Sequence, residues 1–210
     1  LDLLYRLFFV HMSGISMKVS WFNLFFELVR KPRFGAEQLL QLRLNNFQLL
    51  QLSILAICLI SIFLFLVVST FGAILPNSID LQSNQMDIFS ALKSIKPINL
   101  VISGVISFIA RGVALTYFGQ IFKGEGGFRD SILMLAWFDI IHSIGLAIIF
   151  IGLWISPTIT IMLTLLGTIW LVWIATNFIL VLHKFSNIIF VFLGMIFGYF
   201  SLHFLLNLVF

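Results

Sequence analysis

The sequence has little charge for its length. Only 10% of its 210 residues are charged, whereas soluble domains carry about 25%. A chain so poor in charge, with 61% hydrophobic residues, cannot cover its surface with polar groups in water. This scarcity excludes a soluble globular protein and predicts helices whose surfaces face lipid.

Cysteine and catalytic motifs are also scarce. Cys58 is the only cysteine, so an intrachain disulfide is excluded. The four histidines are scattered, whereas a metal site needs three or four convergent ligands. The sequence contains no serine-nucleophile, zinc-protease, paired-carboxylate or nucleic-acid-binding motif. We therefore expect no metal, no cofactor and no nucleic-acid partner, and we predict that the protein is not an enzyme.

What the sequence does contain is five long apolar runs. A transmembrane helix needs about 20 apolar residues to cross a hydrocarbon core of about 30 Å. The runs do not alternate between apolar and polar residues, as strands of a membrane barrel would. We predict an all-α, polytopic membrane bundle of five spans, at residues 47–75, 98–122, 131–154, 158–182 and 188–210.

The segment before the first span predicts a short amphipathic helix. From Trp21 to Leu28, apolar residues recur at helical spacing, until Pro32 breaks the run and a second short helix can follow over residues 36–46. Basic side chains beside an apolar face suit the lipid headgroup region. The residues expected at the membrane surface are Lys18, Trp21, Arg30, Lys31 and Arg33.

Charge near the span ends predicts the orientation. Most Lys and Arg residues lie before the first span and in the turns after the second and fourth spans. The positive-inside rule then puts the N-terminus in the cytoplasm and the C-terminus on the far side. We divide the chain into a cytoplasmic amphipathic segment, 17–46, and a membrane domain, 47–210. Because Met12 and Met17 are candidate starts, residues 1–16 are an uncertain start without structural interpretation.

Two charged residues lie inside predicted spans, where a charge costs about 2.5–3.5 kcal/mol. Arg111 and Asp139 lie roughly 18 Å and 14 Å from the turn that joins the second and third spans, at 1.5 Å per residue, so they can pair. Ser107 and His142 share their helix faces. The predicted intramembrane cluster of Arg111, Asp139, His142 and Ser107 has two readings: a structural pair that fixes two helices, or a proton or ion path.

Glycines mark two further places. Gly194 and Gly198, four residues apart in the last span, predict close helix packing. The run from Gly124 to Gly127 lacks the preceding strand and the Gly-Lys-Ser/Thr ending of a phosphate loop. We therefore predict a tight, flexible turn there.

Three stretches together resemble the Yip family, the Ypt/Rab-interacting-protein domain, and especially its bacterial inner-membrane branch. They are residues 28–39, residues 122–132 followed by Ala136 and Trp137, and residues 182–186. The resemblance implies five spans, a cytoplasmic N-terminus, a periplasmic C-terminus and no known catalytic residue. Eukaryotic relatives bind small GTPases through a longer N-terminal region than this chain has. The turn that matches the family motif contains Gly124, Gly126, Gly127 and Phe128.

Two functional hypotheses follow. The first is a non-enzymatic membrane protein of the Yip type that organises membranes or scaffolds partners, with the lipid bilayer and either a membrane protein or a second copy as its contacts. The alternative is a small transporter or channel subunit that uses Arg111, Asp139 and His142. The environment of Asp139 discriminates between them, because transport needs a polar cavity and scaffolding does not.

Overall fold

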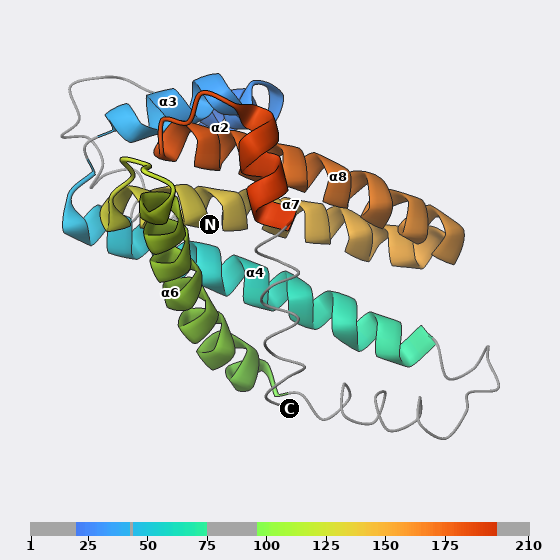
Figure 1. Cartoon of the computed structure of the whole chain (residues 1–210). Helices are drawn as coiled ribbons and strands as arrows, with labels where there is room; N and C mark the ends of the chain where they lie inside the picture. The colour runs from blue at the N-terminus through green and yellow to red at the C-terminus, as the bar shows by residue number, and fades with distance from the viewer. Residues whose placement is uncertain (1–19, 43, 75–95, 197–210) are drawn as a thin grey trace, which may run out of the picture.

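The computed structural model describes residues 20–42, 44–74 and 96–196, and these form helices and connecting turns without a strand (Figure 1). The fold class predicted for this part, all-α, is confirmed. Residues 188–196 are helical as well. The named helices are α2 (Trp21–Arg30), α3 (Pro32–Gln41), α4 (Asn46–Ile74), α6 (Pro97–Ile121), α7 (Phe128–Ile155) and α8 (Pro157–Leu182).

Four of these helices are long and apolar enough to cross a membrane: residues 46–70 of α4, and the whole of α6, α7 and α8. Their 25 to 28 residues extend roughly 38–42 Å, which exceeds a hydrocarbon core of about 30 Å. The chain is thus a multi-pass helical membrane protein. Most of the predicted fifth span, from residue 197 onward, lies outside the described residues.

The long helices do not form a uniform bundle. In Figure 1, α4, α7 and α8 run alongside one another, while α6 crosses them at a steep angle. The helices α2 and α3 lie against the end at which α4 and α7 begin and α6 and α8 finish. We call α2, α3, residues 111–139 and residues 174–185 the head, and residues 144–170 the far end.

The helices α2 and α3 form a tight corner that packs on α7 and α8. Leu24 and Leu28 of α2 and Leu39 of α3 are fully buried. A Cβ on Gly35 would lie 2.7 Å from the backbone nitrogen of Leu28, so only glycine lets the two helices approach this closely. The apolar face predicted from Trp21 to Leu28 is therefore packed against protein.

Two predicted helix boundaries are wrong, each for a local reason. The second short helix begins at Pro32 rather than residue 36 and ends at Gln41, because proline is tolerated in the first turn, where its missing N–H is not needed. The third span begins at Phe128 rather than residue 131, so Phe128 belongs to α7 and not to the turn. Asp130 in its first turn complements the helix dipole.

Candidate functional site

Arg111 of α6 and Asp139 of α7 form a bidentate ion pair. The two terminal guanidinium nitrogens of Arg111 donate to the two carboxylate oxygens of Asp139, each over 2.8 Å. Asp139 is fully buried, whereas 40% of the Arg111 side chain is exposed. Parallel hydrogen bonds of this kind are the strongest that a carboxylate makes with a side chain. The pair ties α6 to α7 and occupies both oxygens of Asp139.

The other members of the predicted cluster do not join this pair. Ser107 is exposed on α6, and His142 is half-buried with its ring 6.2 Å from that of Phe138. Ser143 donates to the backbone carbonyl of Asp139, not to its carboxylate. Among the described residues, the structure thus yields an isolated ion pair rather than a chain of polar groups.

A cavity of about 510 Å³ lies between α6, α7, α8 and residues 188–196. Arg111 and His183 are the only polar side chains among its lining residues, and the rest are apolar or glycine. A path for ions or protons would need a succession of polar groups or water. The described walls of this cavity instead offer an apolar surface.

Gly194 lies in the wall of that cavity. No described atom comes within 4 Å of the position that an added Cβ would take there. Gly194 therefore makes no close helix contact among the described residues, and close packing through Gly194 and Gly198 stays a prediction. Gly198 lies outside the described residues.

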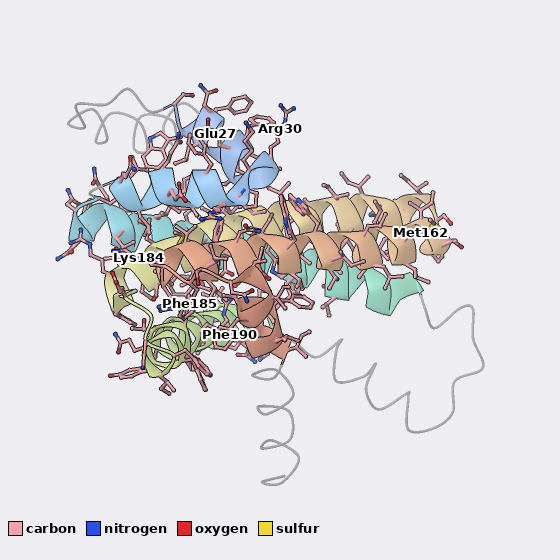
Figure 2. All side chains as sticks on the ribbon, turned by 45° about the horizontal axis from the view of Figure 1, so that its top comes forward. Glu27, Arg30, Met162, Lys184, Phe185 and Phe190 are labelled. Atoms are coloured by element: carbon pink, nitrogen blue, oxygen red, sulfur yellow. The ribbon has the colours of Figure 1, made fainter. Side chains whose placement is uncertain are left out.

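His183, directly after α8, is the centre of a second buried arrangement. Its Nε2 lies 3.0 Å from the carbonyl oxygen of Leu115 in α6, and its Nδ1 lies 3.2 Å from the backbone nitrogen of Gly126. The side chain is 1% exposed. The histidine thus joins the end of α8 to α6 and to the turn that follows α6. The ring of Phe185, which Figure 2 labels together with Lys184 and Phe190, has its centroid 5.5 Å from that of the His183 ring.

These two partners fix the protonation state of the ring. The Leu115 carbonyl can only accept, so Nε2 carries the hydrogen, and the Gly126 N–H can only donate, so Nδ1 is bare. Both needs are met by the neutral imidazole. Burial lowers the pKa of His183 below its ordinary value, and the hydrogen bond to Leu115 opposes this shift.

Three glycines make room for this ring, and we call Gly119, Gly124 and Gly126 the glycine socket. A Cβ would lie 1.9 Å from the His183 ring if placed on Gly119, 2.6 Å from the side chain on Gly124, and 2.8 Å on Gly126. No described glycine has a positive φ, so backbone freedom is not the reason for them. The prediction of a flexible turn is replaced by a socket filled by a histidine.

Further contacts between segments that are far apart in the sequence hold the head together. Trp21 of α2 stacks on Trp137 of α7, with ring centroids 5.9 Å apart and planes inclined by 11°. Thr116 donates to Ser131 over 2.8 Å where α6 meets α7, and both are buried. Arg129 donates to the carbonyl oxygen of Leu44, just before α4. These contacts hold α2, α4, α6 and α7 together at one end.

The predicted surface residues divide into two groups. Trp21 is half-buried in the stack with Trp137, so it is a packing residue. Arg30, Lys31 and Arg33 are exposed at the corner between α2 and α3, and the guanidinium carbon of Arg30 lies 5.8 Å from the centre of the Phe26 ring. Lys18 lies outside the described residues.

Sequence reasoning placed His183 in a short turn and assigned it no role. The signal that could have found it was the glycine spacing. Gly119 lies inside a span that otherwise consists mainly of larger residues, and Gly124 and Gly126 follow in the turn. Glycines at several positions facing one point indicate close approach of another group. The sequence does not reveal which group that is, because His183 lies 57 residues after Gly126.

No protein-family model matches this chain, and neither a curated protein nor a solved structure shows a significant match to it. Among the described residues, no group of three or more His, Cys, Asp or Glu side chains is arranged to hold a metal ion.

Proposed function

We propose that this protein is a non-enzymatic, five-span membrane protein of the Yip type that scaffolds partner proteins or organises the membrane around its head. Its proposed place is the bacterial inner membrane, with the head and the N-terminus in the cytoplasm and the C-terminus in the periplasm. The head carries Arg30, Lys31, Arg33, Lys123, Arg129 and Lys184. This excess of basic residues supports the orientation through the positive-inside rule.

The observation that carries the scaffolding proposal is the outer face of α2. Phe22, Phe26 and Arg30 are spaced by four residues and therefore share one face. Phe22 is 69% exposed and Phe26 is 39% exposed, although Leu24 and Leu28 on the opposite face are buried. Aromatic side chains and arginine are the types most enriched at protein interfaces. A rigid helix that presents them outward suits partner binding.

The alternative, transport through Arg111, Asp139 and His142, has less support. Asp139 is fully buried, and Arg111 takes both of its carboxylate oxygens. The adjoining cavity has apolar walls apart from Arg111 and His183. A carboxylate that carries protons has to exchange them with water, and these contacts seal it. The pair is better explained as the fixed joint between α6 and α7.

Site-specific photo-cross-linking in native membranes tests the proposal. A photoreactive phenylalanine analogue replaces Phe22 on the outer face of α2, and the matched control carries it at Ile148, which is 49% exposed at the far end. We expect a discrete protein adduct from position 22 and only lipid adducts from position 148. Lipid adducts alone from both positions would show that the α2 face contacts the membrane and that scaffolding through it is wrong.

A flux measurement tests the alternative directly. Purified protein in liposomes is compared with the variant Asp139→Asn under an imposed pH gradient. We expect no proton flux above empty liposomes for either protein. Flux in the wild type that disappears in Asp139→Asn would replace scaffolding with transport.

A further inference from the structure

The corner between α2 and α3 forms a cleft against α8. It measures about 570 Å³ and is lined by Arg30, Lys31, Pro32, Arg33, Phe34 and Glu37 from the corner, and by Trp173 and Asn177 from α8. The corner is held firmly, because Leu28, Ala36 and Leu39 beneath it are fully buried. The cleft is therefore a built feature of the head and not a chance gathering of mobile side chains.

The charge of the cleft is strongly one-sided. Its lining residues include three cations and one carboxylate, that of Glu37. Glu37 already lies 3.5 Å from Arg33, which leaves Arg30 and Lys31 without a carboxylate among the described residues. Cations that converge on one cleft of this size favour an anion with several acceptor oxygens, such as a phosphate group.

An apolar stripe leads away from this cleft along α8. Met162, Leu166, Ile169 and Trp173 follow one another at spacings of three or four residues and are 58%, 63%, 68% and 43% exposed. The stripe extends roughly 17 Å at 1.5 Å per residue. Figure 2 shows Arg30 at the head and Met162 at the opposite end of the molecule. Trp173 belongs to both features, because it lines the cleft and is the last residue of the stripe.

A cationic cleft at one end of a membrane-facing apolar stripe fits one kind of molecule. We propose that the corner binds an anionic phospholipid, with its phosphate among Arg30, Lys31 and Arg33 and an acyl chain along the stripe from Trp173 to Met162. The site rests on the membrane embedding in the proposed function, but it does not need a protein partner. Its ligand lies in the cleft against α8, whereas the proposed partner face is the outer side of α2, and Arg30 is the one described residue named in both.

Native mass spectrometry of detergent-purified full-length protein tests this site. The probes are phosphatidylglycerol, phosphatidylcholine with the same acyl chains, and glycerol phosphate, which has the anionic group without the chains. We expect phosphatidylglycerol to bind in preference to phosphatidylcholine, and glycerol phosphate not to displace it. Each juxtamembrane cation contributes about 1 kcal/mol to binding of anionic lipid, which corresponds to about fivefold in affinity.

The test variant is Lys31→Gln/Arg33→Gln, which leaves Arg30 on the outer face of α2 unchanged. The matched control is Lys96→Gln/Lys123→Gln, which removes two exposed cations outside the cleft. The test variant should lose the preference for phosphatidylglycerol, with affinity about 25-fold lower, while the control keeps it. Circular dichroism checks that both variants stay folded. Equal losses in both variants, equal binding of the two lipids by the wild type, or displacement by glycerol phosphate would overturn the proposal. Each of these results leaves the cross-linking test at Phe22 unaffected.

Discussion

Along α7, nearly every side chain from Ser131 to Asp139 is buried, whereas Ile144, Ile148, Ile151 and Trp154 on the same helix are exposed. The helix α8 shows the reverse order along the chain, with exposed residues first and a buried stretch from Ile174 to Leu182. Both buried stretches lie in the head. Both exposed stretches lie in the far end, where the neighbour of an apolar side chain is lipid.

The head and the far end differ in how many polar groups need hydrogen-bond partners within the protein. A polar group in a membrane protein needs a partner within the protein, because hydrocarbon offers none. In the described residues, Asp139, Ser131, Thr116 and His183 all find such partners in the head. The far end relies on apolar side chains that lipid can solvate. The head therefore determines the helix arrangement, and the far end determines membrane insertion.

The largest expected effect comes from breaking the buried ion pair. Arg111→Leu leaves the fully buried carboxylate of Asp139 without a partner, which should lower the free energy of unfolding by about 3–5 kcal/mol. Asp139→Leu should lower the free energy of unfolding less, because the partly exposed Arg111 side chain can extend toward the membrane–water interface. Thermal unfolding in detergent, followed by circular dichroism, measures both.

The double variant Arg111→Leu/Asp139→Leu serves as the control for that experiment. It removes both charges together, so it should recover most of the lost stability. If Arg111→Leu alone were as stable as the wild type, the pair would not be the joint between α6 and α7.

The glycine socket gives the next largest effect and sharpens the contrast between the two regions. Gly119→Ala places a Cβ 1.9 Å from the His183 ring, and such overpacking should lower the free energy of unfolding by about 1–3 kcal/mol. Gly167→Ala at the far end meets no atom within 4 Å, so it should be neutral or stabilise α8 by up to about 1 kcal/mol. Thermal unfolding of the two variants side by side measures the difference.

A second variant separates the clash from a general sensitivity of α6. His183→Ala removes the ring with which the new methyl group would clash. Adding Gly119→Ala to this variant should therefore lower the free energy of unfolding only slightly further. If Gly119→Ala lowered the free energy of unfolding equally with and without the His183 ring, the ring would not fill the glycine socket.

The sequence predicted the parts of the fold that depend on composition and on distance along a helix. Four spans could be found from hydropathy alone, and Arg111 could be matched with Asp139 because a short turn sets their depths. The position of Pro32 misled the prediction of α3, because proline both ends one helix and begins the next.

The parts that could not be predicted depend on contacts between segments far apart in the chain. Trp21 was assigned to the membrane surface, but it stacks on Trp137. Amphipathic patterning says that one face of a helix is apolar, and it does not say whether lipid or protein covers that face. The glycines that surround His183 resembled a flexible turn for a similar reason. A glycine in the sequence shows that a side chain is missing, but it does not show which group occupies the space.

A pH dependence of moderate size in the free energy of unfolding should come from His183 in the head. Burial places the pKa of His183 below its value of 6.5 in an unfolded chain, so on acidification the unfolded chain takes up the proton first. The free energy of unfolding is therefore fully retained above about pH 6.5 and declines as the pH falls below it. Protonation would also set an Nδ1–H against the Gly126 N–H.

Thermal unfolding between neutral and mildly acidic pH measures this decline in the wild type and in His183→Gln. The variant cannot titrate at this position and should show a flatter profile. A wild-type slope in His183→Gln would assign the dependence to other groups.

The smallest effect should come from the ion pair of Lys184 with Glu125, which is the shortest among the described residues. Lys184 Nζ lies 2.6 Å from Glu125 Oε2, but the two side chains are 70% and 66% exposed. The hydrogen bond that Lys184 donates to Glu125 raises the pKa of Lys184 above its ordinary value, yet water competes for both groups at this exposure. Lys184→Gln should therefore leave thermal unfolding unchanged at neutral pH, in contrast to Arg111→Leu, whose ion pair is bidentate and has a buried carboxylate. If Lys184→Gln and Arg111→Leu lowered the free energy of unfolding equally, desolvation would not explain the difference in strength between the two ion pairs. The glycine socket next to Lys184 would then depend on the charge of that lysine.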